Sequence, residues 1–108
     1  MADDRVFGNI ATKLLMENDK VRIWEMRLAP GEKSDLHRHE LDYIMIQISG
    51  DKMAAAFEPD SGGEWAGHDY VEGDIGPGNV LFAKAGGLET AVNVGKEEFH
   101  EIVVELKD

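Results

Sequence analysis

The sequence predicts an all-β domain, either a sandwich or a barrel, and two observations carry this prediction. Short runs rich in β-branched and aromatic residues recur along the chain, and glycine- and proline-containing turns separate them at near-regular intervals. The expected strands lie at 21–28, 43–49, 52–57, 79–83, 90–94 and 99–106. The expected turns lie at 17–19, 29–31, 49–51, 58–63, 72–74, 76–78, 85–87 and 94–98.

The chain of 108 residues has the length of a single domain. We expect 21–108 to form the barrel, and 1–20 to form an N-terminal segment that is partly irregular or strand. The apolar run at 9–19 has no clear helix cap or stop signal, so no helix is expected there.

Period-two alternation indicates which faces of the strands point inward. One face of the run 43–49 carries three isoleucines, at 44, 46 and 48, and requires burial. Its other face carries larger side chains, Tyr43, Met45 and Gln47, which suit the lining of a cavity. Trp24 alternates with other apolar residues of 21–28 and is expected in a pocket wall or in the core. Several strands have apolar residues on both faces, which favours a closed barrel or a subunit interface.

The chain is strongly acidic. The chain carries 22 acidic and 11 Lys or Arg residues, a formal net charge of -11. This balance argues against nucleic acid or an anionic membrane as a partner, because both attract a basic surface. The chain starts with two acidic residues near Met1 and has no long apolar run, so a cytoplasmic protein is expected.

The chain contains no cysteine, which limits the chemistry of any metal site. Disulfides, thiolate nucleophiles and cysteine-based zinc or iron–sulfur sites are excluded. A bound metal would be held by imidazole, carboxylate, phenolate or water, which favours first-row ions such as Zn, Ni, Mn or Fe.

Two of the four histidines stand two residues apart at the start of a strand-like run. Residues i and i+2 of a strand point to the same face, so both imidazoles can approach one ion. The spacing Gly31–x5–His37–x–His39–x3–Tyr43–x6–Gly50 resembles the first motif of the cupin family, G-x5-H-x-H-x3,4-E-x6-G. The tyrosine stands where the family has its glutamate ligand.

A second stretch is similar to the other cupin motif, G-x5-P-x-G-x2-H-x3-N. It reads Gly78–x5–Lys84–x–Gly86–x2–Glu89–x3–Asn93, with lysine in place of proline and glutamate in place of the histidine ligand. The resemblance covers about residues 21–106. It implies a small antiparallel β-barrel of the jelly-roll type.

The resemblance also implies a metal site and an activity. The family holds its metal with residues at the positions of His37 and His39, and Glu89 is a plausible substitute ligand. Tyr43 is expected to act as a fourth ligand, a hydrogen-bond donor or a general acid. Gln47, Met45 and Trp24 are the expected substrate-binding residues.

Two functions follow from this resemblance and remain open at the level of sequence. The first is a metal-dependent enzyme that acts on a small molecule by oxygenation, isomerisation or lyase chemistry. The second is a non-catalytic barrel that binds a small ligand or a partner and has a degenerate metal site. The apolar outer faces predict a homodimer in either case.

Overall fold

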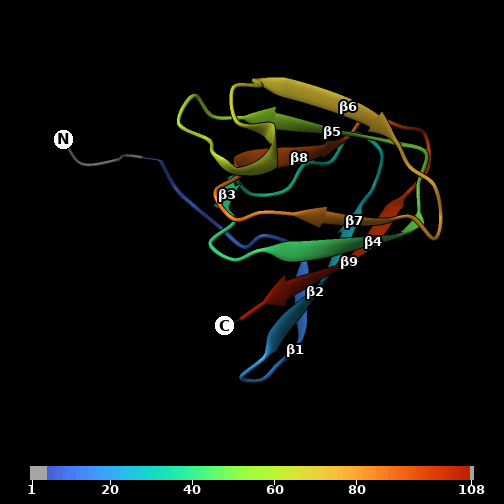
Figure 1. Ribbon diagram of the computed structural model, residues 1–108. Coiled ribbons are helices and arrows are strands. Elements are labelled where there is room, and N and C mark those ends of the chain that lie inside the picture. Colours follow the sequence, from blue (N-terminus) through green and yellow to red (C-terminus); the bar gives the residue numbers. More distant parts are fainter. Residues whose placement is uncertain (1–4, 108) are drawn as a thin grey trace.

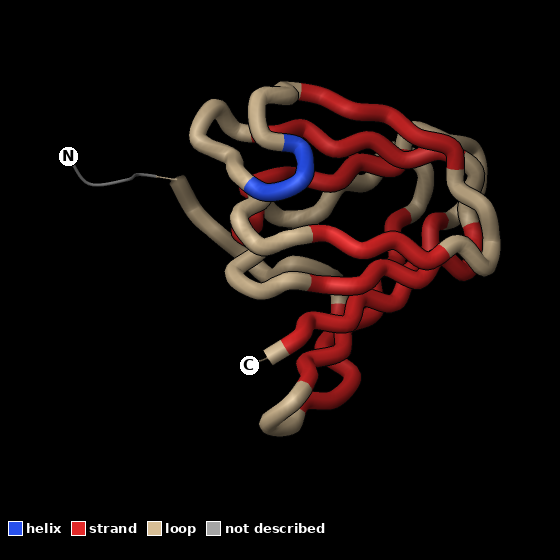
Figure 2. Tube along the Cα trace, in the orientation of Figure 1, coloured by secondary structure: helices blue, strands red, loops and turns tan. Residues whose placement is uncertain are grey.

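The computed structural model describes residues 5–107 and confirms the all-β prediction (Figures 1 and 2). In this range the chain forms nine strands and one short 3-10 helix, η1 (Gly63–Trp65). The strands are β1 (Lys13–Glu17), β2 (Val21–Leu28), β3 (His37–Arg38), β4 (Tyr43–Ser49), β5 (Lys52–Phe57), β6 (Tyr70–Asp74), β7 (Val80–Ala83), β8 (Leu88–Asn93) and β9 (Phe99–Leu106).

The strands form two antiparallel sheets that face each other (Figure 1). The five-stranded sheet has the order β1-β2-β9-β4-β7, and the four-stranded sheet has the order β3-β8-β5-β6. The chain crosses repeatedly from one sheet to the other, which is the connectivity of a jelly roll. This crossing pairs β3 with β8, although they are far apart in the sequence.

The alternation predicted for β4 is confirmed. Tyr43 and Gln47 are buried, and together with Met45 they line the interior between the sheets. The three isoleucines of β4 point to the outer face, where Ile48 is 42% exposed. The expectation that this isoleucine face is buried is therefore not met within a single chain.

Four predicted strands, at 21–28, 43–49, 52–57 and 99–106, coincide with β2, β4, β5 and β9. The turn expected at 72–74 is wrong, because these residues form the end of β6. β6 is an edge strand, and Gly73 is paired with Met53 of β5 within it. β1 lies within the predicted N-terminal segment 1–20, of which residues 1–4 are outside the described range.

The core lies between the sheets and includes Met26, Leu28, Ala83, Phe99 and Val103. The lower parts of β2 and β9, together with β1, extend beyond the four-stranded sheet (Figure 1). Residues at that end of the five-stranded sheet therefore have no opposing sheet to enclose a cavity. No helix in residues 5–107 is long and apolar enough to cross a membrane.

Candidate metal centre and cavity

Two paired strands of the four-stranded sheet bring together the three predicted metal ligands. His37 lies directly opposite Glu89 in the β3–β8 pair, and His39 follows immediately after β3. The position of His39 is fixed by two backbone bonds to the loop before β8. Its N–H donates to the Gly87 carbonyl at 2.8 Å, and its carbonyl accepts from the Gly86 N–H at 2.8 Å.

The loop that holds His39 depends on glycine at one position. Gly86 has φ +115°, in the region that L side chains rarely adopt. A Cβ atom at this residue would lie 2.9 Å from the backbone nitrogen of Gly63. Gly86 is one of the residues that match the second cupin motif, and its role here is a close approach between two loops. The Asn93 of the same motif is buried, and its amide donates to the carbonyls of Leu28 and Glu97.

The side chains of the three predicted ligands converge. One ligand atom from each of His37, His39 and Glu89 lies within 4.8 Å of the others. His39 Nε2 is 3.0 Å from Glu89 Oε1, and His37 Nε2 is 3.7 Å from the same oxygen. The two imidazole rings meet edge to face, with centroids 4.8 Å apart. The two histidines are almost fully buried, and the Glu89 side chain is 12% exposed.

The hydrogen bonds of His37 define the direction of its lone pair. Its Nδ1–H donates to the backbone carbonyl of Asp35 at 2.8 Å, so in the neutral ring Nε2 carries a lone pair. That lone pair faces the Glu89 carboxylate. Two electron pairs facing each other in a buried site require a positive charge between them, either a proton on the imidazole or a bound cation. An outer bond of this kind from Nδ1 to a carbonyl is also the usual support for a metal-binding histidine.

His39 lacks such support. Among residues 5–107, its Nδ1 is the only side-chain nitrogen or oxygen that is itself shut off from solvent and from the cavity and has no hydrogen-bond partner. Its other nitrogen, Nε2, is within hydrogen-bonding distance of Glu89. The nitrogen–nitrogen–oxygen donor set fits a divalent first-row ion, with one outer contact of the histidine pair missing.

Glu89 is ionised in this environment. Burial raises the pKa of its carboxyl, but the neighbouring His37 and His39 outweigh burial and lower the pKa to about 2. The group therefore presents a negative charge toward two imidazoles at neutral pH. This is the charge that a cation at the centre of the trio would neutralise.

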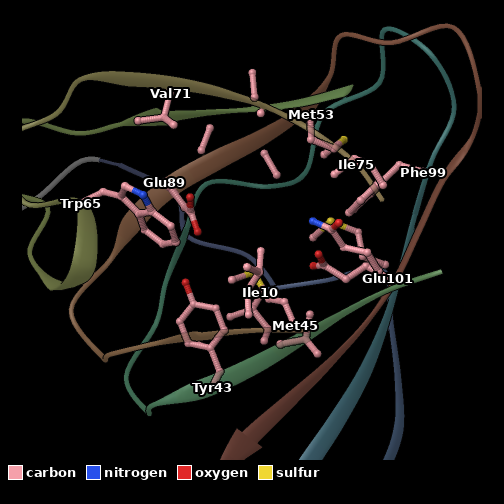
Figure 3. A pocket seen from close by; sticks show the side chains of 18 of the residues that line it. Ile10, Tyr43, Met45, Met53, Trp65, Val71, Ile75, Glu89, Phe99 and Glu101 are labelled. Carbon is pink, nitrogen blue, oxygen red and sulfur yellow. The ribbon is translucent and has the colours of Figure 1, made fainter. Parts of the chain in front are cut away.

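Tyr43 contacts the trio through its aromatic ring. Its ring stacks on His39, with centroids 3.9 Å apart and an interplanar angle of 11°. Burial, and then the negative charges of Glu89, Glu101 and Glu64, raise the pKa of its phenol far above the usual range. The hydroxyl points toward Glu89 in Figure 3 and has no hydrogen-bond partner among the described residues. Its neutral form can donate a hydrogen bond to a ligand.

The trio opens onto a cavity of about 210 Å³ between the two sheets. Most of its lining is apolar, including Met26, Met45, Met53, Phe57 and Trp65. Tyr43 and Gln47 also line it, so the inward positions predicted for three β4 residues are confirmed. Their predicted roles in catalysis and substrate binding stay predictions.

Trp24 is not among the described residues that line the cavity, and it takes the core position that was the other expectation, so its role in substrate binding stays a prediction. It shares one face of β2 with the buried residues Met26 and Leu28. Its cross-strand neighbours are Leu14 and Val103, and its indole N–H donates to Glu105 at 2.6 Å. Trp24 therefore packs against the core and binds a buried carboxylate.

Glu101 of β9 lines the cavity, although it was not among the site residues predicted from the sequence. Alternation in 99–106 places it on the same face as Phe99 and Val103, but the opposite face is also apolar, so alternation alone did not show which face points inward. Nothing in the sequence distinguished it from Glu105, which shares that face. Trp65, in the 3-10 helix, is a second cavity residue that was not among the predicted site residues.

No protein-family model and no curated protein matches this sequence. Solved structures do match it. A cupin domain from Bordetella pertussis is 21% identical with a TM-score of 0.75, and the match covers 99% of this chain and 100% of that chain. An RmlC-like cupin family protein with a double-stranded β-helix fold, from Methanocaldococcus jannaschii, is 17% identical with a TM-score of 0.69. This match covers 99% of this chain and 92% of that chain.

A third similar structure is a DMSP lyase from Ruegeria pomeroyi, which is 20% identical with a TM-score of 0.59. The match covers 84% of this chain and 40% of the lyase chain. These likenesses place the chain in the class of jelly-roll β-barrels. Within that class its fold is that of the cupin superfamily, as the two sequence motifs predicted.

Proposed function

We propose that this cupin is a metal-dependent enzyme that acts on a small molecule inside the barrel. The observation that carries the proposal is the lone pair of His37 Nε2 facing an ionised Glu89, with His39 on the same oxygen. This buried arrangement needs a positive charge. A bound Fe, Mn, Ni or Zn ion would supply Lewis acidity toward an oxygen of the substrate, of water or of dioxygen.

The residues of the chain would hold the ligand beside that centre. His37, His39 and Glu89 would be the metal ligands, and the Asp35 carbonyl would keep His37 in the required tautomer. Tyr43 would be protonated at neutral pH. Its hydroxyl would donate a hydrogen bond to the ligand or act as a general acid. Met45 and Gln47 would contact the substrate from the same strand.

The class of reaction is oxygenation, isomerisation or lyase chemistry. The likeness to a DMSP lyase keeps the lyase class among these three. One fold hosts many reactions, so the site residues rather than the fold must identify the substrate.

Metal analysis of the purified protein tests the proposal. We expect one divalent ion per chain after purification or metal soaking, and a loss of affinity of about a hundredfold or more in His37→Ala and Glu89→Gln, since outer-shell changes alone cost about 10–100-fold. His68→Ala is the matched control, because the His68 side chain is exposed and is not among the residues that line the cavity. A protein that stays metal-free after soaking would contradict the proposal. Unchanged affinity in Glu89→Gln would remove Glu89 from the ligand set and make Tyr43 the next candidate.

The alternative is a non-catalytic barrel that binds a small ligand. The unpartnered His39 Nδ1 favours it, because a metal-binding histidine almost always has an outer partner at its second nitrogen. The same metal analysis separates the two functions, since only the enzyme requires a stoichiometric ion.

We also propose a homodimer formed through the outer face of the five-stranded sheet. Val80 is 62% exposed, Phe82 54% and Ile48 42%, and these residues lie on the neighbouring strands β7 and β4. Light scattering at micromolar concentration should give the mass of two chains for the wild type and of one chain for Phe82→Glu. A monomeric wild type would contradict this proposal. The cytoplasmic location predicted from the sequence stays a prediction.

A further inference from the structure

Glu101 is a buried carboxyl group that the proposed metal centre does not use. It lines the cavity from β9 and is 6% exposed. It makes no hydrogen bond or ion pair with any described residue. Figure 3 shows it toward the end of the cavity opposite Glu89 and Trp65, close to Phe99 and Met45. A polar group that is buried without a partner beside an open volume is in the position of a ligand-binding group.

The environment of Glu101 favours its neutral, proton-carrying form. Burial raises the pKa of Glu101 to about 8, and the negative charge of Glu89 adds to this effect. The described lining of the cavity contains no lysine and no arginine that would stabilise a carboxylate. At neutral pH the group is therefore a carboxylic acid, and its O–H is available as a hydrogen-bond donor.

Gln47 offers a second donor next to it. Gln47 of β4 is the cross-strand partner of Glu101, so the two side chains leave neighbouring positions on the same face. Gln47 Oε1 accepts from the backbone N–H of Gly76 at 3.1 Å and from Asn79 Nδ2 at 3.4 Å. Because a backbone N–H is always a donor, this contact fixes the orientation of the amide. Its Nε2 has no partner among the described residues and offers only N–H groups to the cavity.

We propose that Glu101 and Gln47 together bind the carbonyl oxygen of a small ligand, the carboxylic acid O–H and the amide N–H both donating to it. A carbonyl oxygen has two lone pairs and carries no charge, which matches two neutral donors in a cavity without basic side chains. Paired donors of this kind also stabilise a carbonyl oxygen that gains negative charge during a reaction.

The cavity limits the rest of the ligand. Its volume of about 210 Å³ lies below the usual range of about 300–1,000 Å³ for drug-sized ligands, so it suits a small metabolite. Its middle is lined by apolar side chains, among them Met45 and Met53. The predicted ligand is a short, mainly apolar molecule with a carbonyl group at one end and a metal-binding oxygen at the other. The metal-binding oxygen of this ligand rests on the proposed function. The binding of its carbonyl group by Glu101 and Gln47 does not.

Three probes of similar length test the donor pair: 4-oxopentanoate, pentanoate and 4-aminobutanoate. Their affinities would be measured by titration calorimetry with the zinc-loaded and the metal-free protein. We expect the ketone to bind about tenfold more tightly than pentanoate, as one or two net hydrogen bonds imply. Glu101→Leu should abolish this preference, and Glu101→Gln, which keeps a donor, should retain part of it. Glu98→Gln, a change at an exposed glutamate just before β9, should leave the preference unchanged.

Two results would overturn the inference. The first is a wild type that binds the ketone no better than pentanoate, or binds none of the three probes. The second is a wild type that prefers the ammonium probe and loses this preference in Glu101→Gln, which would make Glu101 an ionised cation site. If zinc fails to bind while the metal-free protein prefers the ketone, the proposed function fails and the donor pair stands.

Discussion

Two glutamates of β9 occupy the same face of the same strand and have opposite surroundings. Glu105 is 1% exposed and Glu101 is 6% exposed. Glu105 accepts hydrogen bonds from Arg22 Nε and Trp24 Nε1, each at 2.6 Å. Glu101, four residues earlier, has no hydrogen-bond partner among the described residues and lies at the cavity.

The difference separates a structural carboxylate from one that is available to a ligand. Glu105 lies near the end of β9, where a cation and an indole from β2 donate hydrogen bonds to it. Glu101 lies where the two sheets enclose a volume, and no side chain completes its hydrogen bonding. Burial alone does not distinguish the two groups, but the presence of partners does.

The largest expected effect is the pH dependence that Glu101 gives to stability. Its pKa rises from 4.5 to about 8 on folding, so the folded chain holds this proton more tightly than the unfolded chain. The free energy of unfolding should therefore fall as the pH rises from 4.5 to 8, by up to about 5 kcal/mol at about 1.4 kcal/mol per pKa unit. Glu101→Gln should remove this loss.

Urea denaturation of the metal-free wild type and of Glu101→Gln, at intervals from pH 5 to about pH 9, measures the effect. Other groups titrate in both proteins, so the difference between the two curves isolates Glu101. The variant should gain stability relative to the wild type as the pH rises. Parallel curves would mean that Glu101 titrates normally in the folded chain.

A smaller effect of opposite sign is expected at Glu105. Glu105→Gln removes the negative charge that accepts the hydrogen bonds of Arg22 and Trp24. Breaking a fully buried pair costs about 3–5 kcal/mol. Arg22 is 31% exposed and regains some hydration, so we expect a loss of about 2 kcal/mol.

The same denaturation experiment at pH 8 compares the two isosteric changes directly. Glu101→Gln should stabilise the protein and Glu105→Gln should destabilise it, although both replace a buried glutamate on one strand face. Effects of the same sign would refute the distinction between the two environments.

Much of the fold could be predicted because the strands carry local signals. The runs at 21–28, 43–49 and 99–106 alternate and contain β-branched residues, the run at 52–57 lies between two predicted turns, and each of the four forms a strand with these bounds. β6 was missed because Glu72, Gly73 and Asp74 have turn composition, and only pairing with β5 makes them a strand. β3 is two residues long and exists through its pairing with β8.

The site residues that belong to a sequence motif were predicted. Those that only tertiary packing brings to the cavity were missed. The spacing of His37 and His39 is local, and the second motif located Glu89 on the strand that pairs with them. Alternation predicted a pocket wall or core position for Trp24 and placed Glu101 on one face with Phe99 and Val103, but it gives no position along the cavity. That position depends on tertiary packing, which leaves Trp24 out of the cavity lining and brings Glu101 into it.

Tyr43 offers the smallest and most selective test, since its hydroxyl, like Glu101, has no partner among the described residues. Tyr43→Phe keeps the ring that stacks on His39 and removes no intramolecular hydrogen bond. We expect a stability change below about 1 kcal/mol. The raised pKa of Tyr43 favours the neutral phenol over a phenolate ligand, so the affinity for zinc should change less than about threefold, below the range of about 10–100-fold for outer-shell contacts. Competition with a zinc chelator measures this affinity, and a loss of tenfold or more would place the phenol among the metal ligands.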